Sequence, residues 1–209
     1  MLALLALAVA APAFAAGGSR EPTKRHTAAD MRLARSIALR RADFVAGWTQ
    51  EKTSSSGGGN ADCSAYPDES KLIETGSVDP SFDSPNGGAV TVDSEVDVYA
   101  TKAMALAEWR NGKLSVLRTC FAELLTKTTG KHVVVTATVQ AVPVHAERVL
   151  AYRFEATWNG VAFDIDLVAF GKGRTTVLLS AAGQKGSYSR SLLAPFARVL
   201  AQRLAAHGS

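Results

Sequence analysis

The sequence predicts an α+β fold, in which an antiparallel sheet of about five strands packs with helices and one disulfide ties the domain. Three observations predict this class. Segments with the composition of strands crowd into residues 90–182, and four of them follow one another as in a meander. Helical patterns lie on both sides of this region and inside it, after its first strand. Strands linked as hairpins, with helices outside them, indicate an antiparallel sheet covered on one face.

The start of the chain has the pattern of an export signal. An apolar run at Leu2–Ala11 precedes Pro12 and a small-x-small triplet at 13–15, which is the pattern that signal peptidase cleaves. No cysteine stands beside the cleavage point, which disfavours a lipid anchor. We therefore expect a secreted or cell-envelope protein without stable membrane insertion after processing. The expected parts are a signal peptide at 1–16, a flexible lead at 17–26 and a single α+β domain at 27–206.

The chain has two cysteines, Cys63 and Cys120. In an oxidising compartment a disulfide between them is the natural expectation, and a metal pair or a reactive thiol is the alternative. The bridge would close a loop of 57 residues, the difference between the two positions. Such a loop corresponds to a stabilisation of about 4 kcal/mol in the chain-entropy model.

Capping and turn residues divide the first half of the chain. Thr27, with Asp30 three residues on, has the form of a capping box and predicts a helix to about Arg41. Residues 53–86 are rich in Ser, Gly, Asp and Pro, which predicts a long loop that Cys63 would tie down. Valine alternates with polar residues over 90–99, which predicts a half-exposed strand.

The second half alternates helices with the meander. Asn111-Gly112 separates two expected helices, and Gly130 ends the second. The expected elements are helices at 102–110 and 113–127, strands at 133–142, 148–158, 161–170 and 174–182, and a last helix from Ser187 or Ser189 to Ala206.

The Asn159-Gly160 dipeptide predicts a two-residue type I′ turn, because both residues tolerate positive φ. This turn sets the register of the strands beside it, with one apolar face and one polar face. The apolar pairs expected are Trp158 with Val161, Ala156 with Phe163, Phe154 with Ile165, and Tyr152 with Leu167. The polar pairs expected are Thr157 with Ala162, Glu155 with Asp164, and Arg153 with Asp166.

Charge is segregated along the chain, although the formal net charge is only +4. Residues 62–97 contain nine acids and one lysine, whereas the segments on either side are basic. The acidic segment could form a cation site or an interaction face, or it could be a solvated loop attached to a basic body. The basic segments lack interleaved aromatic residues, so we expect no nucleic-acid partner.

Sequence motifs of catalysis are missing. The chain has no G-x-S-x-G elbow, no H-E-x-x-H pair and no P-loop, and its four histidines are scattered. We therefore expect no catalytic residues, no metal site and no cofactor. An enzyme built from residues far apart in the sequence remains the alternative, because catalytic groups converge in space.

The best candidate for a ligand site is the polar face of the hairpin, where Glu155 and Asp164 oppose each other beside Arg153 and Asp166. Like charges that face each other across two strands lower the stability by roughly 0.2–1 kcal/mol. We therefore expect a compensating group. In one interpretation these residues line a cleft for a cationic or hydrogen-bonding ligand. In the other they form the solvated face of a sheet covered on one side, where Arg153 bridges the acids. The residues that could join the site from a neighbouring strand are His132 and Gln140.

Several short motifs together resemble a known family. They are D-F-V-A-G-W at 43–48, a cysteine after a Ser/Gly-rich stretch, A-x-x-x-W-R-N-G-K at 105–113 before the second cysteine, and a meander closed by a helix. This order resembles the extracytoplasmic sensor-type domains of actinobacteria, which form the outer part of membrane Ser/Thr kinases and also occur as secreted proteins. It is more distantly similar to the PsbP-type α/β/α sandwich. The resemblance implies a binding module with a cleft and not a catalyst.

We therefore expect a secreted, non-catalytic binding or sensor-type module whose partner is an unknown small ligand or envelope component. Two alternatives stay open. One is a cell-envelope hydrolase. The other is a protein-docking module, which would use the acidic segment at 62–97 or the basic first helix as its contact face.

Overall fold

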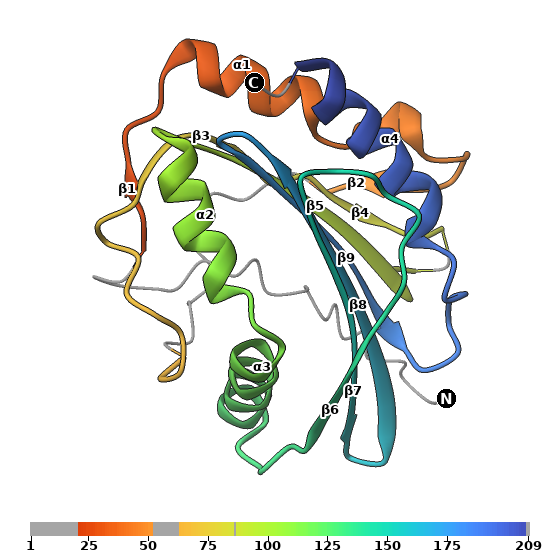
Figure 1. Cartoon of the computed structure of the whole chain (residues 1–209). Coiled ribbons are helices and arrows are strands. Elements are labelled where there is room, and N and C mark those ends of the chain that lie inside the picture. The colour runs from red at the N-terminus through yellow and green to blue at the C-terminus, as the bar shows by residue number, and fades with distance from the viewer. Residues whose placement is uncertain (1–20, 52–62, 86, 208–209) are drawn as a thin grey trace.

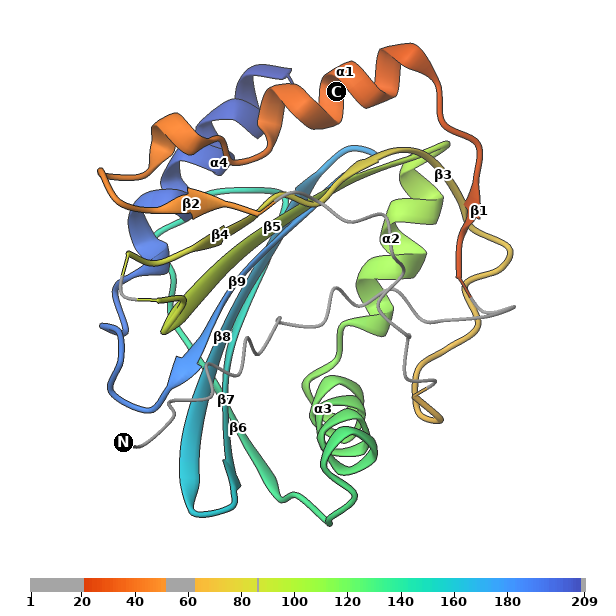
Figure 2. The same cartoon turned by 180° about the vertical axis from the view of Figure 1, so that it is seen from behind.

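One curved sheet with helices on both faces forms the molecule (Figures 1 and 2). The computed structural model describes residues 21–51, 63–85 and 87–207. The expected signal peptide and the first part of the expected lead lie outside the described residues. Helices α1 (Ala28–Ile37) and α4 (Leu193–His207) cover one face, and α2 (Lys102–Asn111) and α3 (Leu114–Thr129) cover the other. The α+β class is confirmed, but the expectation of a single covered face is wrong.

The sheet has nine strands among the described residues and is mixed, so the expected number of strands is too low. Its main path runs β1-β3-β5-β9-β8-β7-β6, and β4 joins β5 and β2 beside this path. All pairs are antiparallel except β1 with β3, where Thr23 lies beside Ile73. The strands are β1 (Thr23–Lys24), β2 (Thr49–Gln50), β3 (Ile73–Val78), β4 (Ser81–Asp83), β5 (Val90–Tyr99), β6 (Val135–Val139), β7 (Arg148–Trp158), β8 (Val161–Lys172) and β9 (Thr175–Gln184).

The acidic segment is where the sequence prediction fails. Strands β3 and β4 lie within the stretch predicted as a loop, because short strands that are rich in Gly, Ser and acids lack the usual strand signal. Strand β5 has the predicted bounds, but it is central to the sheet and not half-exposed. Its valines Val92, Val96 and Val98 are fully buried under α1 and α4, and Ser94 on the same face accepts a hydrogen bond from the Leu39 amide at 3.2 Å. Its carboxylates Glu95 and Asp97 point to the opposite face, which α2 covers.

The meander has the predicted register. The tip of the hairpin is Asn159 and Gly160, with φ of 48° and 78°, and Trp158 lies opposite Val161. All seven predicted cross-strand pairs are present, including Glu155 with Asp164 and Arg153 with Asp166. The turn chemistry was therefore sufficient to align 22 residues of β7 and β8, in 11 pairs.

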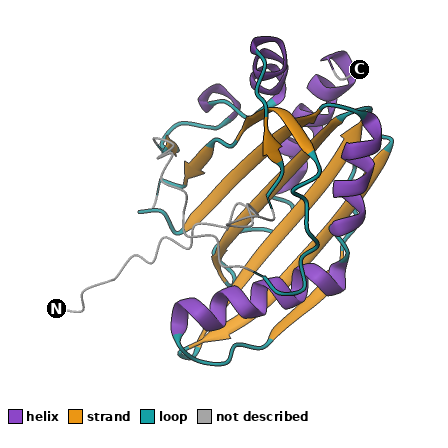
Figure 3. Ribbon diagram, turned by 90° about the vertical axis from the view of Figure 1, so that its left-hand side faces the viewer, coloured by secondary structure: helices purple, strands orange, loops and turns teal. Residues whose placement is uncertain are grey.

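Helices cover both faces of the sheet (Figure 3), and each face has its own hydrophobic core. The core under α1 and α4 contains the fully buried Phe82 and Phe170, and Phe44 stacks on Phe82 with ring centroids 4.2 Å apart. The core under α3 contains Phe121 and Phe154, whose centroids are 4.5 Å apart. Alternation along the strands supplies both cores, because successive side chains point to opposite faces.

Helix α1 begins as predicted and ends earlier. The Thr27 hydroxyl accepts a hydrogen bond from the Asp30 amide at 3.1 Å, and the helix stops at Ile37 because the next residue is extended. The Asp30 carboxylate does not complete a capping box; it is buried and accepts hydrogen bonds from Arg174, with Nη1 to Oδ2 at 2.9 Å. The helix packs directly on β3, since a Cβ at Gly76 would lie 2.5 Å from the Asp30 carbonyl carbon.

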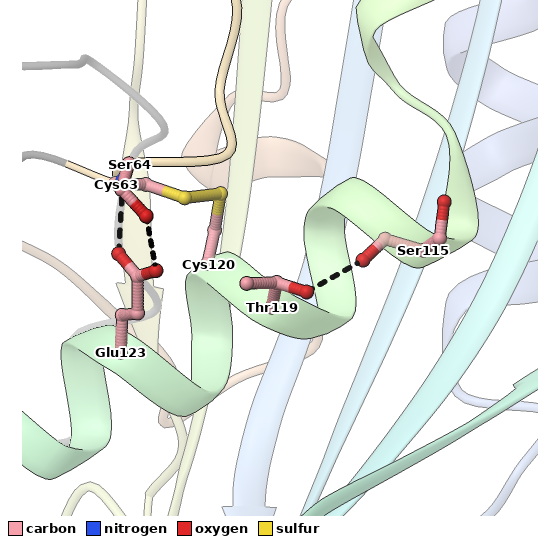
Figure 4. The surroundings of a disulfide bond; sticks show 6 residues. All are labelled: Cys63, Ser64, Ser115, Thr119, Cys120 and Glu123. Carbon is pink, nitrogen blue, oxygen red and sulfur yellow. Dashed lines mark hydrogen bonds between the residues drawn. A yellow bond between two sulfur atoms is a disulfide. The ribbon is translucent and has the colours of Figure 1, made fainter.

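The predicted disulfide is present. Cys63 and Cys120 are bonded, with their Cα atoms 5.1 Å apart, and Cys120 is buried on α3 (Figure 4). Ser64 strengthens the same attachment, because its amide and hydroxyl donate to the two oxygens of Glu123 at 2.9 and 2.6 Å. The chain before β3 is thus tied to α3 by one covalent bond and two hydrogen bonds.

Replacing both cysteines by serine should lower the free energy of unfolding by about 4 kcal/mol, the cost of freeing a loop of this length in the unfolded chain. Urea unfolding followed by circular dichroism measures this change. The wild-type protein in reducing agent is the matched control and should show the same loss. Equal stability of the oxidised and reduced forms would contradict a structural role for the bridge.

Candidate functional site

The predicted polar face of the hairpin is a buried charge network. The Arg153 guanidinium donates from Nε to Asp166 Oδ1 at 2.6 Å and from Nη2 to Oδ2, and its Nη1 lies 3.8 Å from Asp164 Oδ2. All three residues are more than nine-tenths buried. The hydrogen bonds that Arg153 donates to Asp166 raise the pKa of Arg153 above its usual range. The structure thus brings three of the predicted site residues into one cluster.

Tyr188 closes this network from the side of α4. The Arg153 guanidinium lies 5.8 Å from the centre of the Tyr188 ring, and the Tyr188 hydroxyl donates to the Ala181 carbonyl at 3.2 Å. Glu155 stands at the rim, where Lys185 donates to it at 2.8 Å and lowers its pKa. The face is therefore not the solvated surface of one interpretation. Most of its charges are matched within the protein, although Asp164 Oδ1 is buried without a hydrogen-bond partner.

The other two predicted site residues lie apart from the charges. Gln140 follows β6, and its side chain donates to the hydroxyl of Thr138 at 2.9 Å. His132 is exposed ahead of β6. Among the hydrogen bonds and ion pairs of the described residues, none joins His132 or Gln140 to the Arg153 network.

The opposite face holds a second set of acids, here called the acidic cluster: Glu69, Glu95, Asp97 and Glu108. Glu95 and Asp97 alternate with valines along β5 and therefore point toward α2. Glu108 reaches down from α2 and accepts a hydrogen bond from the Thr176 hydroxyl on β9 at 3.2 Å. Glu69, just before β3, accepts from the Asn111 side chain at 2.7 Å. Sequence segments some 40 residues apart thus meet on one side of the sheet.

Burial and mutual repulsion raise the pKa values of carboxyls in this cluster. Burial, followed by the charge of Glu74, raises the pKa of Asp97 to about 7. Burial, followed by the charge of Asp97, raises the pKa of Glu108 to about 8. The pKa of Glu95 is raised by the same two causes, burial first and Asp97 second. In the described ranges no Lys or Arg forms an ion pair with any member of the cluster.

A row of paired residues crosses the sheet from β7 to β5, with an arginine, Arg148, at one end and Asp97 of the acidic cluster at the other. Arg148 on β7 extends across β8 at Gly171, where a Cβ would stand 2.5 Å from its Nη2, and donates to the Thr175 carbonyl on β9 at 3.3 Å. Its guanidinium lies 5.7 Å from the centre of the Trp109 ring. The Nε and Nη1 atoms are buried without a hydrogen-bond partner, as is Oδ1 of Asp97 farther along the row. Buried polar atoms without a hydrogen-bond partner thus lie at both ends of this row.

Apolar side chains border the acidic cluster. Tyr66 and Trp109 are partly buried against the α3 core, and Leu178 lies on β9 directly opposite Glu95. The arrangement is a group of carboxyls with apolar neighbours, which suits a ligand that has both a positive group and a hydrocarbon part. Among the described residues no cluster of His, Cys, Asp or Glu has the arrangement of a metal site.

Part of this site could be predicted from the charge pattern of the sequence. The charge segregation at 62–97 indicated a cation site as one possibility, and the described part of that segment supplies Glu69, Glu95 and Asp97. Glu108 and Arg148 carried no signal, because only the placement of α2 and the register of β7 to β5 bring them to the cluster. The interpretation of the acidic segment as a solvated loop is wrong for Glu69 and Glu74, which are 5% and 6% exposed, whereas Asp68 and Asp79 are exposed residues outside the strands.

A hollow lies at the β2–β4 edge of the sheet. It has a volume of about 300 Å³ and is bordered by Gly47, Thr49, Asp83 and Ser84 together with the turn that follows them. Backbone and small side chains dominate this hollow, so it offers little chemistry compared with the acidic cluster.

The architecture is that of an α+β domain with helices on both faces of one sheet. It is similar to the crystal structure of the extracellular domain of PknH from Mycobacterium tuberculosis, with a TM-score of 0.51 and 8% sequence identity over 84% of this chain and 96% of that one. This likeness shows a shared fold and transfers no residue. No family model and no curated protein matches the sequence. None of the described helices is long and apolar enough to span a membrane.

Asp166→Asn should lower the free energy of unfolding by roughly 3–5 kcal/mol, because it leaves the buried Arg153 charge without its two charged hydrogen bonds. Thermal and urea unfolding measure the loss. Asp164→Asn is the matched control, and it should cost about 1 kcal/mol or less because Arg153 keeps its bonds to Asp166. Equal losses in the two variants would refute the assignment of Asp166 as the main partner.

The protein should become less stable as the pH rises from about 4 to about 8. Carboxyls whose folded pKa lies above the unfolded value of 3.8 or 4.5 bind protons more tightly in the folded state, so their contribution is complete at low pH and is lost as the pH passes the folded pKa. Glu108→Gln should raise the melting midpoint at pH 8 by roughly 2–4 °C, which corresponds to about 1 kcal/mol in a domain of this size.

Melting curves between pH 4 and pH 9 provide the measurement. Glu147→Gln is the control, because Lys102 holds the pKa of that exposed carboxyl below its usual value. It should give no gain at pH 8. A melting midpoint that rises steadily from pH 5 to pH 8 in the wild-type protein would show that the acidic cluster is not destabilised by ionisation.

Proposed function

We propose that this chain is an extracytoplasmic, non-catalytic sensor-type module, and that its acidic cluster binds a small ligand with a positively charged amine. The observation that carries the proposal is the set of carboxyls on the α2 side of the sheet, which have raised pKa values and no ion-pair partner among the described residues. The likeness in fold to the extracellular domain of a PknH protein supports the module class. The disulfide is compatible with a place outside the cytoplasm.

The physical reason is the energy of uncompensated charge. At neutral pH, Asp97 and Glu108 must either hold protons or lie close to other negative charges in surroundings poor in water. An ammonium group removes this conflict, because it donates up to three hydrogen bonds and lowers the pKa of each carboxyl that it contacts. The hydrocarbon part of such a ligand can pack on Trp109 and Leu178.

The Arg153 network supports ligand binding less well. Its guanidinium is already bonded through two nitrogens to Asp166, and Tyr188 covers it. A ligand there would have to displace Tyr188 and break a buried ion pair. The network is better explained as a structural device that joins β7 and β8 to the segment before α4.

The competing function is that of a cell-envelope hydrolase. A carboxyl with a pKa of about 8, such as Glu108, is protonated at neutral pH and meets one requirement of a general acid. A catalyst would also release altered products. Recovery of an unchanged ligand after incubation supports binding, and turnover of peptidoglycan or another envelope polymer that Glu108→Gln abolishes would overturn the proposal.

The direct test is a thermal shift of the purified protein at pH 8 with putrescine, spermidine or cyclohexylamine, each against sodium chloride of equal ionic strength. A bound amine should raise the melting midpoint, since a ligand at 100 times its dissociation constant adds about 2.7 kcal/mol to stability. The shift should shrink at pH 5, where the carboxyls hold protons.

Matched variants assign the effect to one face of the sheet. The double variant Asp97→Asn, Glu108→Gln should lose the amine-dependent shift, whereas Glu155→Gln, Asp164→Asn on the opposite face should keep it. If every amine behaves as sodium chloride does, or if both double variants respond alike, the acidic cluster is not the binding site.

A further inference from the structure

Strand β6 forms one edge of the sheet, and β1 lies at the other end of the main strand path (Figure 1). Strand β6 pairs only with β7, where Ala137 lies opposite Phe154, and no described strand lies along its other side. Thr136, Thr138 and Val139 are exposed, so no described residue covers this edge at those positions. An uncovered edge strand presents unpaired backbone donors and acceptors to any chain that can pair with it.

The direction of these backbone groups follows from the ladder with β7. The Gln140 amide donates to the carbonyl of Ala151, which lies directly opposite in the same register, so this is a hydrogen-bonded pair. Such pairs alternate in an antiparallel ladder. The backbone groups of Thr136 and Thr138 therefore also face β7, and those of Val135, Ala137 and Val139 face outward.

The edge has none of the devices that usually block pairing. Residues 133–144 contain no charged side chain, and β6 itself contains neither proline nor a bulge. Two large apolar side chains on or next to the strand are exposed, Val134 by 67% and Val139 by 72%. These features favour pairing with another strand over protection from it.

The sequence of β6 indicates which strand that is. Val135-Thr136-Ala137-Thr138-Val139 is the same in both directions, so an antiparallel copy centred on Ala137 places Val opposite Val and Thr opposite Thr. Both are favourable cross-strand pairs. We propose that the chain forms a homodimer in which β6 pairs antiparallel with β6 of a second copy about a two-fold axis at Ala137.

The outward backbone groups fit this axis. With Ala137 on the axis, its amide and carbonyl meet those of the partner's Ala137, and Val135 meets the partner's Val139 through its own outward groups. The sheets of both copies then form one continuous sheet. Most stable interfaces bury about 1,200–2,000 Å², and a contact of five residues from each copy is small by comparison. The dimer is therefore expected to be weak and dependent on concentration.

Two variants test the edge without disturbing the ladder to β7. Ala137→Pro removes an outward amide, a position at which an edge strand tolerates proline. Val139→Lys places a charge on the exposed edge of β6. Each should raise the dimer dissociation constant at least tenfold in sedimentation equilibrium of the protein purified from cells that express it from Met1. Val45→Lys is the control, because Val45 is 74% exposed and lies outside the meander, and it should dimerise as the wild type does.

Hydrogen exchange gives a second measurement that does not depend on the variants. In the wild type the amides of Ala137 and Val139 should exchange more slowly as protein concentration rises, while the exposed amide of Val45 should not change. A wild-type protein that remains monomeric at millimolar concentration overturns the proposal. It is also overturned if the dimer persists in both folded variants, or if exchange at Ala137 and Val139 does not depend on concentration.

Discussion

The alternation of valine and carboxylate along β5 is the constraint on which the rest of the structure depends. This strand is central, with β3 and β4 on one side and β9 on the other. Its valines complete the core under α1 and α4, and its acids form the floor of the acidic cluster on the other face. A shift of one residue in its pairing would exchange the two sets. The register of β5 with β9 therefore determines at once where the core lies and where the charges converge.

The two faces resolve buried charge in different ways. On the α4 side, Arg153 bonds to Asp166 through two nitrogens, and the pair can remain ionised because each charge has its counterpart. On the α2 side, no guanidinium or ammonium of the described residues lies within ion-pair distance of Glu95, Asp97 or Glu108, and the raised pKa values express that lack. One set of charges is compensated within the fold, whereas the other lowers the stability of the folded protein at neutral pH.

Local signals predicted much of the fold. The Asn159-Gly160 turn predicted the hairpin register, Thr27 predicted the start of the first helix, and the two cysteines predicted the disulfide. The strands that the sequence analysis missed share one property. Strands β1 to β4 are short and polar, and they form only because β5 and α1 offer a partner and a cover. Pattern within a segment cannot report support that comes from elsewhere in the chain.

The contact between α1 and α4 joins the two ends of the described chain. Arg203 donates to the Ala38 carbonyl at 2.8 Å across 165 positions of sequence, and Leu200 and Leu204 fill the same core as Ile37. The first helix thus cannot complete its burial until the last helix has been synthesised. Contacts between segments so far apart in the sequence are slow to form, so this core closes only when nearly the whole described chain is available.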